Sequence, residues 1–248
     1  SDVCSSDLSI ILSKRISVLS VPIDCITMDE AVSKIIEMTK QSGLHLVATA
    51  NAEMVMLANQ DPVLHGILNS ASLVVPDGAG ILWAAERMGE RVPERVTGVD
   101  ITKELFKQAV SNQIPIYCLG AAPGVAQQAV SNLQAMYGTI NIAGIHDGFF
   151  DEAEEQRIIN DIKTSGAKLV FVALGVPKQE QWISEKLSSL QGVVAIGIGG
   201  SFDVLAGNIP RAPHWMQRNR LEWLYRLYLE PKRIGRMLAI PKFMWTVI

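Results

Sequence analysis

The sequence predicts an α/β fold with a mainly parallel, doubly wound (Rossmann-like) sheet, helices on both of its faces and a C-terminal helical appendage. Three observations carry this prediction. Short β-rich runs alternate with helical patterns along most of the 248 residues. The later runs are apolar on both faces, which is typical of parallel strands that helices cover on each side. Hydrophobic residues make up 48% of the chain, enough to fill a sizeable core.

The expected strands and helices alternate in order. Strands are predicted over residues 16–23, 45–50, 72–76, 114–120, 140–145, 168–175 and 193–200. Helices are predicted over residues 28–42, 51–70, 78–89, 99–112, 123–137, 151–165 and 177–190. Asp61 before Pro62 is typical of an N-cap with proline in the first turn, and Gly43 and Gly138 stand where helices should stop. In such a sheet ligands bind at the carboxyl ends of the strands.

The chain divides into three segments by composition. Residues 1–13 lack an initiator Met and follow no periodicity, so we expect an assembly scar or a disordered start. Residues 14–210 hold the expected α/β core. Residues 211–248 carry eight Lys or Arg against two acids, a net +6, while the rest of the chain carries −9. Basic residues with Trp and Tyr at helical spacing indicate either a helix on an anionic membrane surface or packing on the core or a sister subunit. Both interpretations stay open.

Several classes of protein are disfavoured. Cys4, Cys25 and Cys118 have no CxxC spacing, which argues against a disulfide framework or a zinc site. No run of about 18 apolar residues predicts a membrane span, and the start lacks the pattern of a secretory signal. The acidic body and the lack of a recognition motif count against nucleic acid. We therefore expect a cytoplasmic protein.

Polar residues and glycines follow several of the expected strands. They are Thr49 and Asn51, then Asp77, Arg95, Gly120 with Gly124, Gly175 with Lys178 and Gln179, and finally Gly199, Gly200 and Asp203. Because the carboxyl ends of parallel strands share one edge of a sheet, these loops should meet there. Their convergence predicts a site more strongly than any single motif does.

Asp77 and Arg95 each have two interpretations. An Asp before Gly is commonly a turn former or a helix N-cap, but at a strand end it can also be a general base beside glycines that let a substrate approach. Arg95 is either a solvated side chain or a group that orients an acceptor or holds a phosphate. Gln179 falls in the first turn of a helix that Pro177 could begin.

The glycine-rich loops are weaker signals. LGAAPG and GIGGSF are not GxGxxG, so a dinucleotide site loses its main support, although a helix N-terminus after Gly124 could still hold an anion. Asp147 stands where mononucleotide-binding folds place a ribose-binding acid, and a turn residue is an equal alternative. The chain has no Asp-x-Asp pair, HExxH or P-loop, and its histidines show no ligand spacing. We expect metal-free chemistry without a cofactor.

Five motifs in order, TANAE, PDGAG, ERVTGVD, GVPKQE and GGSFDVLAGNIPRAP, resemble the WecG/TagA/CpsF glycosyltransferase family over about residues 16–238. The resemblance implies an inverting, metal-independent transfer of N-acetylmannosamine, or its uronic acid, from UDP to undecaprenyl-diphosphate-linked N-acetylglucosamine. It also implies a role in cell-surface polymer synthesis, for instance of teichoic acid, and peripheral association with the inner face of the bacterial plasma membrane.

The resemblance also implies roles for individual residues. Asp77 would be the base, with Thr49, Asn51, Gln179 and Arg95 at the family's active-site positions. We expect the UDP-sugar to meet Gly120, Gly124, Asp147, Gly175, Gly199, Gly200 and Asp203, and the lipid diphosphate to meet Arg226, Arg233 and Arg236. The alternatives are a nucleotide-sugar epimerase or dehydrogenase, and a noncatalytic UDP-sugar-binding membrane module. The donor, the polymer pathway and a homo-oligomeric state are left open by the sequence.

Overall fold

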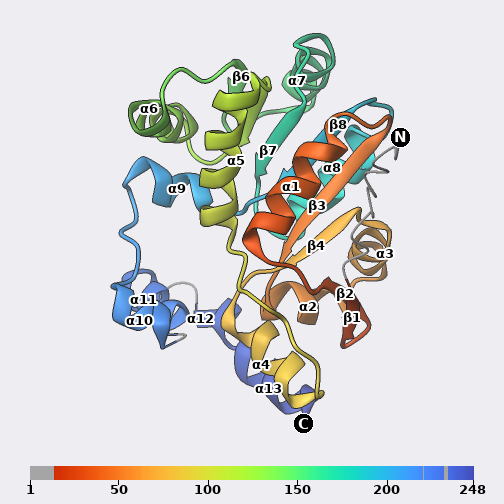
Figure 1. The fold of residues 1–248 in the computed structure, drawn as a ribbon, viewed down its shortest axis with the longest axis vertical. Helices are drawn as coiled ribbons and strands as arrows, with labels where there is room; N and C mark the ends of the chain where they lie inside the picture. Colours follow the sequence, from red (N-terminus) through yellow and green to blue (C-terminus); the bar gives the residue numbers. More distant parts are fainter. Residues whose placement is uncertain (1–13, 220, 232–233) are drawn as a thin grey trace, which may run out of the picture.

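The computed structural model describes residues 14–219, 221–231 and 234–248, so the expectation for residues 1–13 falls outside the described residues. Its centre is a six-stranded sheet in the order β4-β3-β8-β7-β5-β6 (Figure 1). The strands are β3 (Leu44–Ala50), β4 (Leu73–Pro76), β5 (Ile116–Gly120), β6 (Ile142–His146), β7 (Leu169–Ala173) and β8 (Val193–Gly197). Neighbouring strands pair in parallel throughout this sheet. The predicted fold class is confirmed.

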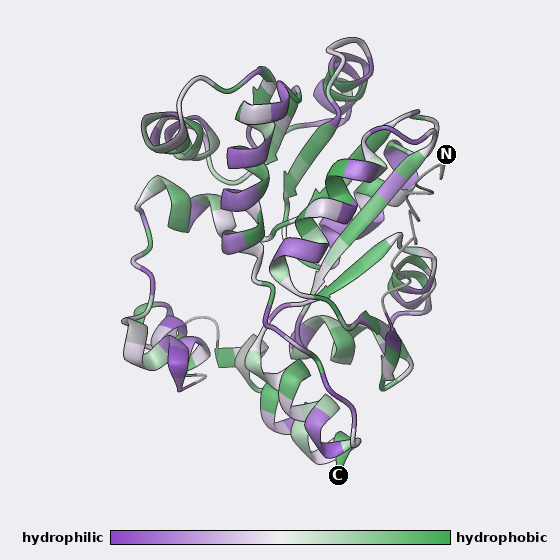
Figure 2. Cartoon of the chain, viewed as in Figure 1, coloured by the Kyte–Doolittle hydropathy of each residue, from purple (hydrophilic) through white to green (hydrophobic). Residues whose placement is uncertain are grey.

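Helices cover both faces of the sheet, and each face has its own hydrophobic cluster. One face is covered by α1 (Met28–Met38), α5 (Gly98–Asn112), α6 (Val125–Tyr137) and α9 (Ser201–Ala206). The other side holds α2 (Ala52–Ala58), α3 (Pro62–Ser70), α4 (Ala79–Arg87), α7 (Glu152–Thr164) and α8 (Lys178–Lys186). The strands are coloured mostly hydrophobic in Figure 2, as expected for a sheet buried on both sides.

Residues 16–23, predicted as one strand, form an antiparallel hairpin outside the main sheet. Its strands are β1 (Arg15–Val18) and β2 (Val21–Asp24), and both turn residues, Leu19 and Ser20, have left-handed φ angles of 47° and 66°. Because the residues on both sides of the turn are apolar, the hydrophobic pattern does not reveal that the chain reverses direction there. Asp24 then accepts a hydrogen bond of 2.7 Å from the Val74 N–H of the edge strand β4, which satisfies a donor that an edge leaves unpaired.

The predicted helix over residues 51–70 is two helices, α2 and α3, and the break falls where the capping signal stands. The Asp61 side chain accepts hydrogen bonds from the N–H groups of Val63 and Leu64, with Pro62 in the first turn. The apolar residues on both sides of Asp61 favoured one long helix in the prediction, but the N-cap at Asp61 starts a second helix.

The C-terminal segment folds into α10 (His214–Arg218), α11 (Glu222–Leu229), α12 (Ile234–Met237) and α13 (Ala239–Val247). Pro231 lies between α11 and α12. The last helix packs against α2 and α4, and its Phe243 is fully buried in the cluster on that side of the sheet (Figure 1). The proposed division at residue 210 stays a prediction, but α13 shares its core with residues 52–87.

We expect Phe243→Ala to lower the free energy of unfolding by about 3–5 kcal/mol, the usual cost of removing a buried aromatic ring. Trp245→Ala, on the same helix with 84% of the residue exposed, is the matched control and should change stability little. Urea denaturation followed by circular dichroism measures both. Equal stability of the two variants would show that α13 is not anchored in the core.

Candidate active site

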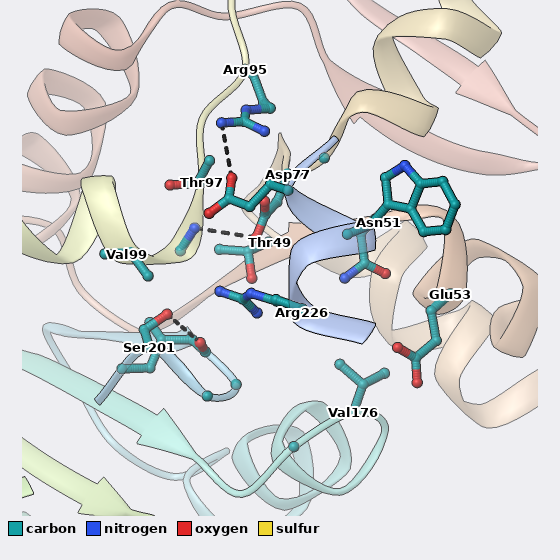
Figure 3. Close-up of a pocket in the computed structure, with 18 of the residues that line it drawn as sticks. Thr49, Asn51, Glu53, Asp77, Arg95, Thr97, Val99, Val176, Ser201 and Arg226 are labelled. Carbon is teal, nitrogen blue, oxygen red and sulfur yellow. Dashed lines mark hydrogen bonds and ion pairs between the residues drawn. The ribbon is translucent and has the colours of Figure 1, made fainter. Parts of the chain in front are cut away.

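A pocket of about 220 Å³ lies at the carboxyl edge of the sheet, beyond the ends of β3, β4, β7 and β8 (Figure 3). Its wall includes residues from the segments after those four strands, from the segment that leads into α5, and from α11. The pocket therefore joins the α/β core to the C-terminal segment.

The structure brings most of the predicted site residues to this pocket. Those that line it are Thr49, Asn51, Asp77, Arg95, Gly175, Gln179, Gly199, Gly200 and Arg226. They come from parts of the chain that are up to 177 residues apart in sequence, and they meet because the strands before them are parallel.

Four predicted contacts of the sugar nucleotide lie elsewhere, and three of them have a visible structural role. Gly120 lets β5 approach β7, since a Cβ there would stand 2.4 Å from the Ala173 carbonyl oxygen. Gly124 is the left-handed N-cap of α6. Asp147 closes a turn by accepting from the Phe149 N–H at 2.8 Å. Asp203 lies within α9 and is not among the residues that line the pocket. Their contact with a nucleotide stays a prediction.

Of the arginines predicted for the lipid diphosphate, Arg226 reaches the pocket from α11. Arg233 falls outside the described residues, and Arg236 belongs to the short helix α12. Their role stays a prediction.

Asp77 is the acid at the centre of the pocket. Its backbone N–H donates to the Ala50 carbonyl at 2.8 Å, which continues the pairing of β4 with β3. Its side chain does not cap α4, whose N-cap is Gly78 and carries no side-chain cap. Instead, Oδ2 accepts from the Gly98 N–H in the first turn of α5 at 3.2 Å (Figure 3). The partial positive charge of a helix N-terminus stabilises the ionised form.

Burial dominates the acidity of Asp77. It raises the pKa of this carboxyl to about 6, against the opposing effects of the Gly98 N–H, Arg226 and Arg95, while Glu222 adds to the rise. A carboxylate with a pKa near neutrality is a better proton acceptor than an exposed one and is still ionised at pH 7.

The charges around Asp77 are paired through the C-terminal segment. The Arg95 guanidinium lies 3.1 Å from a Glu222 oxygen, and Arg211 approaches the other Glu222 oxygen at 3.8 Å. Arg211 also donates to Asp100 at 2.6 Å. Glu222 belongs to α11, so this acid fastens α11 over the pocket and places Arg226 beside Asp77.

Three polar side chains of the pocket are held by the backbone. Thr49 Oγ1 donates to the Gly197 carbonyl at 2.9 Å, and Asn51 Oδ1 accepts from the Met54 N–H at 2.9 Å as the N-cap of α2. Gln179 Oε1 accepts from the Gly199 N–H at 3.0 Å. These bonds fix the side chains before any ligand arrives, which is the preorganisation that a binding site needs.

Sequence reasoning missed several residues of the pocket wall: Glu53, Thr97, Ser201, Glu222 and Trp223. Only Glu222 carried a usable signal, because it is one of two acids in a basic segment. Among the described residues, no group of three or more His, Cys, Asp or Glu side chains is arranged to hold a metal ion. Metal-independent chemistry stays a prediction.

Comparison with known proteins points to one family. The model of the glycosyl transferase WecG/TagA/CpsF family matches residues 16–248. A protein of Bacillus subtilis (strain 168) named N-acetylglucosaminyldiphosphoundecaprenol N-acetyl-beta-D-mannosaminyltransferase is 38% identical over 82% of this chain and 78% of its own length. A Staphylococcus aureus (strain NCTC 8325) protein of the same name is 34% identical over 94% of this chain and 92% of its own.

We expect Glu222→Gln to lower the pKa of Asp77 below its value of about 6. The substitution removes a negative charge that raises this pKa and leaves the Arg95 charge without its acidic partner. The side-chain ¹³C shift of Asp77, assigned through Asp77→Asn, reports the titration. Glu185→Gln, an exposed change on α8, is the control and should leave it unmoved. An unchanged or higher pKa of Asp77 in Glu222→Gln would contradict the electrostatic effect of Glu222 on Asp77.

Proposed function

The chain belongs to the WecG/TagA/CpsF glycosyltransferase family, and from this premise we propose that it transfers N-acetylmannosamine from a UDP donor to undecaprenyl-diphosphate-linked N-acetylglucosamine. It is a glycosyltransferase of cell-wall polymer synthesis, and its relatives' name supports both the transferred sugar and the acceptor. The single observation that carries the proposed mechanism is the Asp77 carboxylate, which faces a pocket that also holds Arg95 and Arg226.

Asp77 is the proposed general base. An acceptor hydroxyl is a weak nucleophile at neutral pH, so a carboxylate within hydrogen-bond reach removes its proton as it attacks. A bond forms between the acceptor oxygen and the anomeric carbon, the bond from that carbon to the phosphate oxygen breaks, and UDP leaves with the electron pair. The proton ends on Asp77. One displacement from an α-linked UDP-sugar gives the β-linked product that the relatives' name prints.

The leaving UDP gains negative charge, and the pocket offers positive groups to it. Arg95 and Arg226 lie on either side of Asp77 (Figure 3). Arg226 belongs to α11, which forms part of the pocket wall. Positive groups that are fixed in place and screened from water stabilise such charge more than water does. Because Glu222 binds Arg95 in this structure, a diphosphate that binds Arg95 must compete with that carboxylate.

Peripheral association with the inner face of the plasma membrane completes the proposal. No described helix is long and apolar enough to cross a bilayer. The C-terminal segment nevertheless exposes large hydrophobic side chains: Trp215, Trp223, Leu224, Tyr228, Ile234, Leu238, Met244, Trp245 and Ile248. With its basic residues, this surface suits an anionic membrane in which the lipid-linked acceptor is held.

The decisive assay is transfer by the purified chain to a lipid-diphosphate acceptor, with UDP-N-acetylmannosamine and its uronic acid in parallel. We expect Asp77→Asn to fold and to lose turnover by about 10²–10⁴-fold, the usual contribution of a general base. Wild-type turnover should fall as the pH drops below about 6, because Asp77 must be ionised to accept the proton. Asp29→Asn, exposed in the first turn of α1, is the control. Normal turnover by Asp77→Asn would place the base elsewhere.

We also expect the paired change Tyr228→Ser with Trp245→Ser to weaken binding to vesicles that contain phosphatidylglycerol by roughly tenfold, since two aromatic side chains would no longer leave water. Both residues are more than three quarters exposed, at 80% and 84%. Phe149→Ser, 73% exposed but on the loop after β6, is the matched control. Vesicle flotation measures the binding. Equal losses of vesicle binding in the control and the paired variant would show that these C-terminal side chains do not contact the membrane specifically.

A further inference from the structure

Glu180 is a buried acid that the proposed mechanism does not use. Its side chain is fully inaccessible to solvent, and burial raises its pKa to about 7. One carboxyl oxygen, Oε1, accepts a hydrogen bond of 2.7 Å from Gln179 Nε2, while Oε2 has no hydrogen-bond partner among the described residues. A buried polar atom without a partner costs stability, so such a group calls for a role that offsets the cost.

The hydrogen bonds to Glu180 and Gly199 together hold the Gln179 amide in one orientation. Gln179 Oε1 accepts from the Gly199 N–H at 3.0 Å, and its NH₂ group donates to Glu180. A flipped amide would set its oxygen against a carboxylate oxygen and its NH₂ group against an N–H. The Gly199 N–H can only donate and the Glu180 oxygen Oε1 accepts, so the two partners together favour this orientation.

The surrounding backbone leaves room for this pair of side chains. A Cβ at position 197 would stand 2.6 Å from Gln179 Nε2 and 2.8 Å from Glu180 Oε1, so only glycine fits there without a shift. The carbonyl of Gly197 in turn accepts from Thr49 Oγ1 at 2.9 Å. Thr49, Gly199 and Gln179 all line the pocket, whereas Glu180 does not. Glu180 can therefore act on a ligand only through Gln179.

We propose that Glu180 is a positioning residue for glycosyl transfer. It holds the fully buried Gln179 amide in one orientation, so that the amide carbonyl fixes the N–H of Gly199, a residue of the pocket wall. The inference rests on the proposed function, because it assumes that the sugar substrate meets the Gly199 loop that Gln179 holds. The unpaired oxygen of Glu180 lowers stability, and the benefit is a preorganised pocket wall.

The test compares Glu180→Met, an apolar side chain of similar length, with Glu180→Gln, which keeps an acceptor oxygen. We expect turnover by Glu180→Met to fall at least about tenfold, the order expected when a contact group is misplaced. Its unfolding free energy should equal or exceed that of the wild type, because an unpaired buried carboxyl is gone. Glu180→Gln should keep most of the activity, and Glu185→Met, exposed on the same helix, all of it.

Two further measurements separate positioning from a structural role. In a Gln179→Ala background, Glu180→Met should cause no additional loss of turnover, since Gln179→Ala already removes the amide that Glu180 holds. The ¹⁵N-detected side-chain amide of Gln179 should be protected from hydrogen exchange in the wild type and lose that protection in Glu180→Met.

Each outcome decides the inference. Wild-type turnover in Glu180→Met, a less stable Glu180→Met, or an unchanged Gln179 amide would overturn it. A wild-type protein that transfers neither donor would instead overturn the proposed function, and the amide measurement would still decide whether Glu180 orients Gln179.

Discussion

The shared direction of the six parallel strands is the constraint on which the rest of the structure depends. It brings the ends of β3, β4, β7 and β8 to one edge, and the pocket lies there. The strand order also decides which loops take part. β5 and β6 occupy the far end of the sheet beyond β7, so Gly120, the last residue of β5, and Asp147, which follows β6, lie away from the pocket even though they are on the same edge. Direction alone is therefore not enough, and position within the sheet selects the site.

That distinction explains how far the sequence could predict the site. Alternating apolar runs are enough to predict a parallel sheet and a common edge, so Thr49, Asp77 and Gln179 could be placed together in advance. The order of strands depends on how helices pack across the sheet, which a single sequence does not reveal. The hairpin over residues 15–24 was missed for a related reason, because its turn residues, Leu19 and Ser20, are not the Gly or Asn that usually mark such a turn.

The C-terminal segment is where composition was informative but incomplete. Its net positive charge suggested a contact with a membrane or with phosphate, yet the residue that fastens α11 to the pocket is an acid, Glu222. Opposite charges at the interface between α11 and the core provide a specific contact that a purely basic helix could not make with Arg95. The same logic applies to α13, in which Phe243 is the one buried residue and Ile240 and Val247 are partly buried against the same cluster. A count of charges or of exposed aromatic residues over the whole segment does not reveal the role of single residues such as Glu222 and Phe243.

Asp77 and Glu180 show why a raised pKa does not by itself identify a general base. Burial raises the pKa of both carboxyl groups, to about 6 and about 7. Only Asp77 opens onto the pocket, where cationic side chains and the Gly98 N–H favour its charged form. Glu180 faces the amide of its neighbour and has no path to a substrate hydroxyl except through Gln179. A proton acceptor must contact the proton that it removes. Because only Asp77 is accessible from the pocket, we assign proton transfer to Asp77 and a positioning role to Glu180.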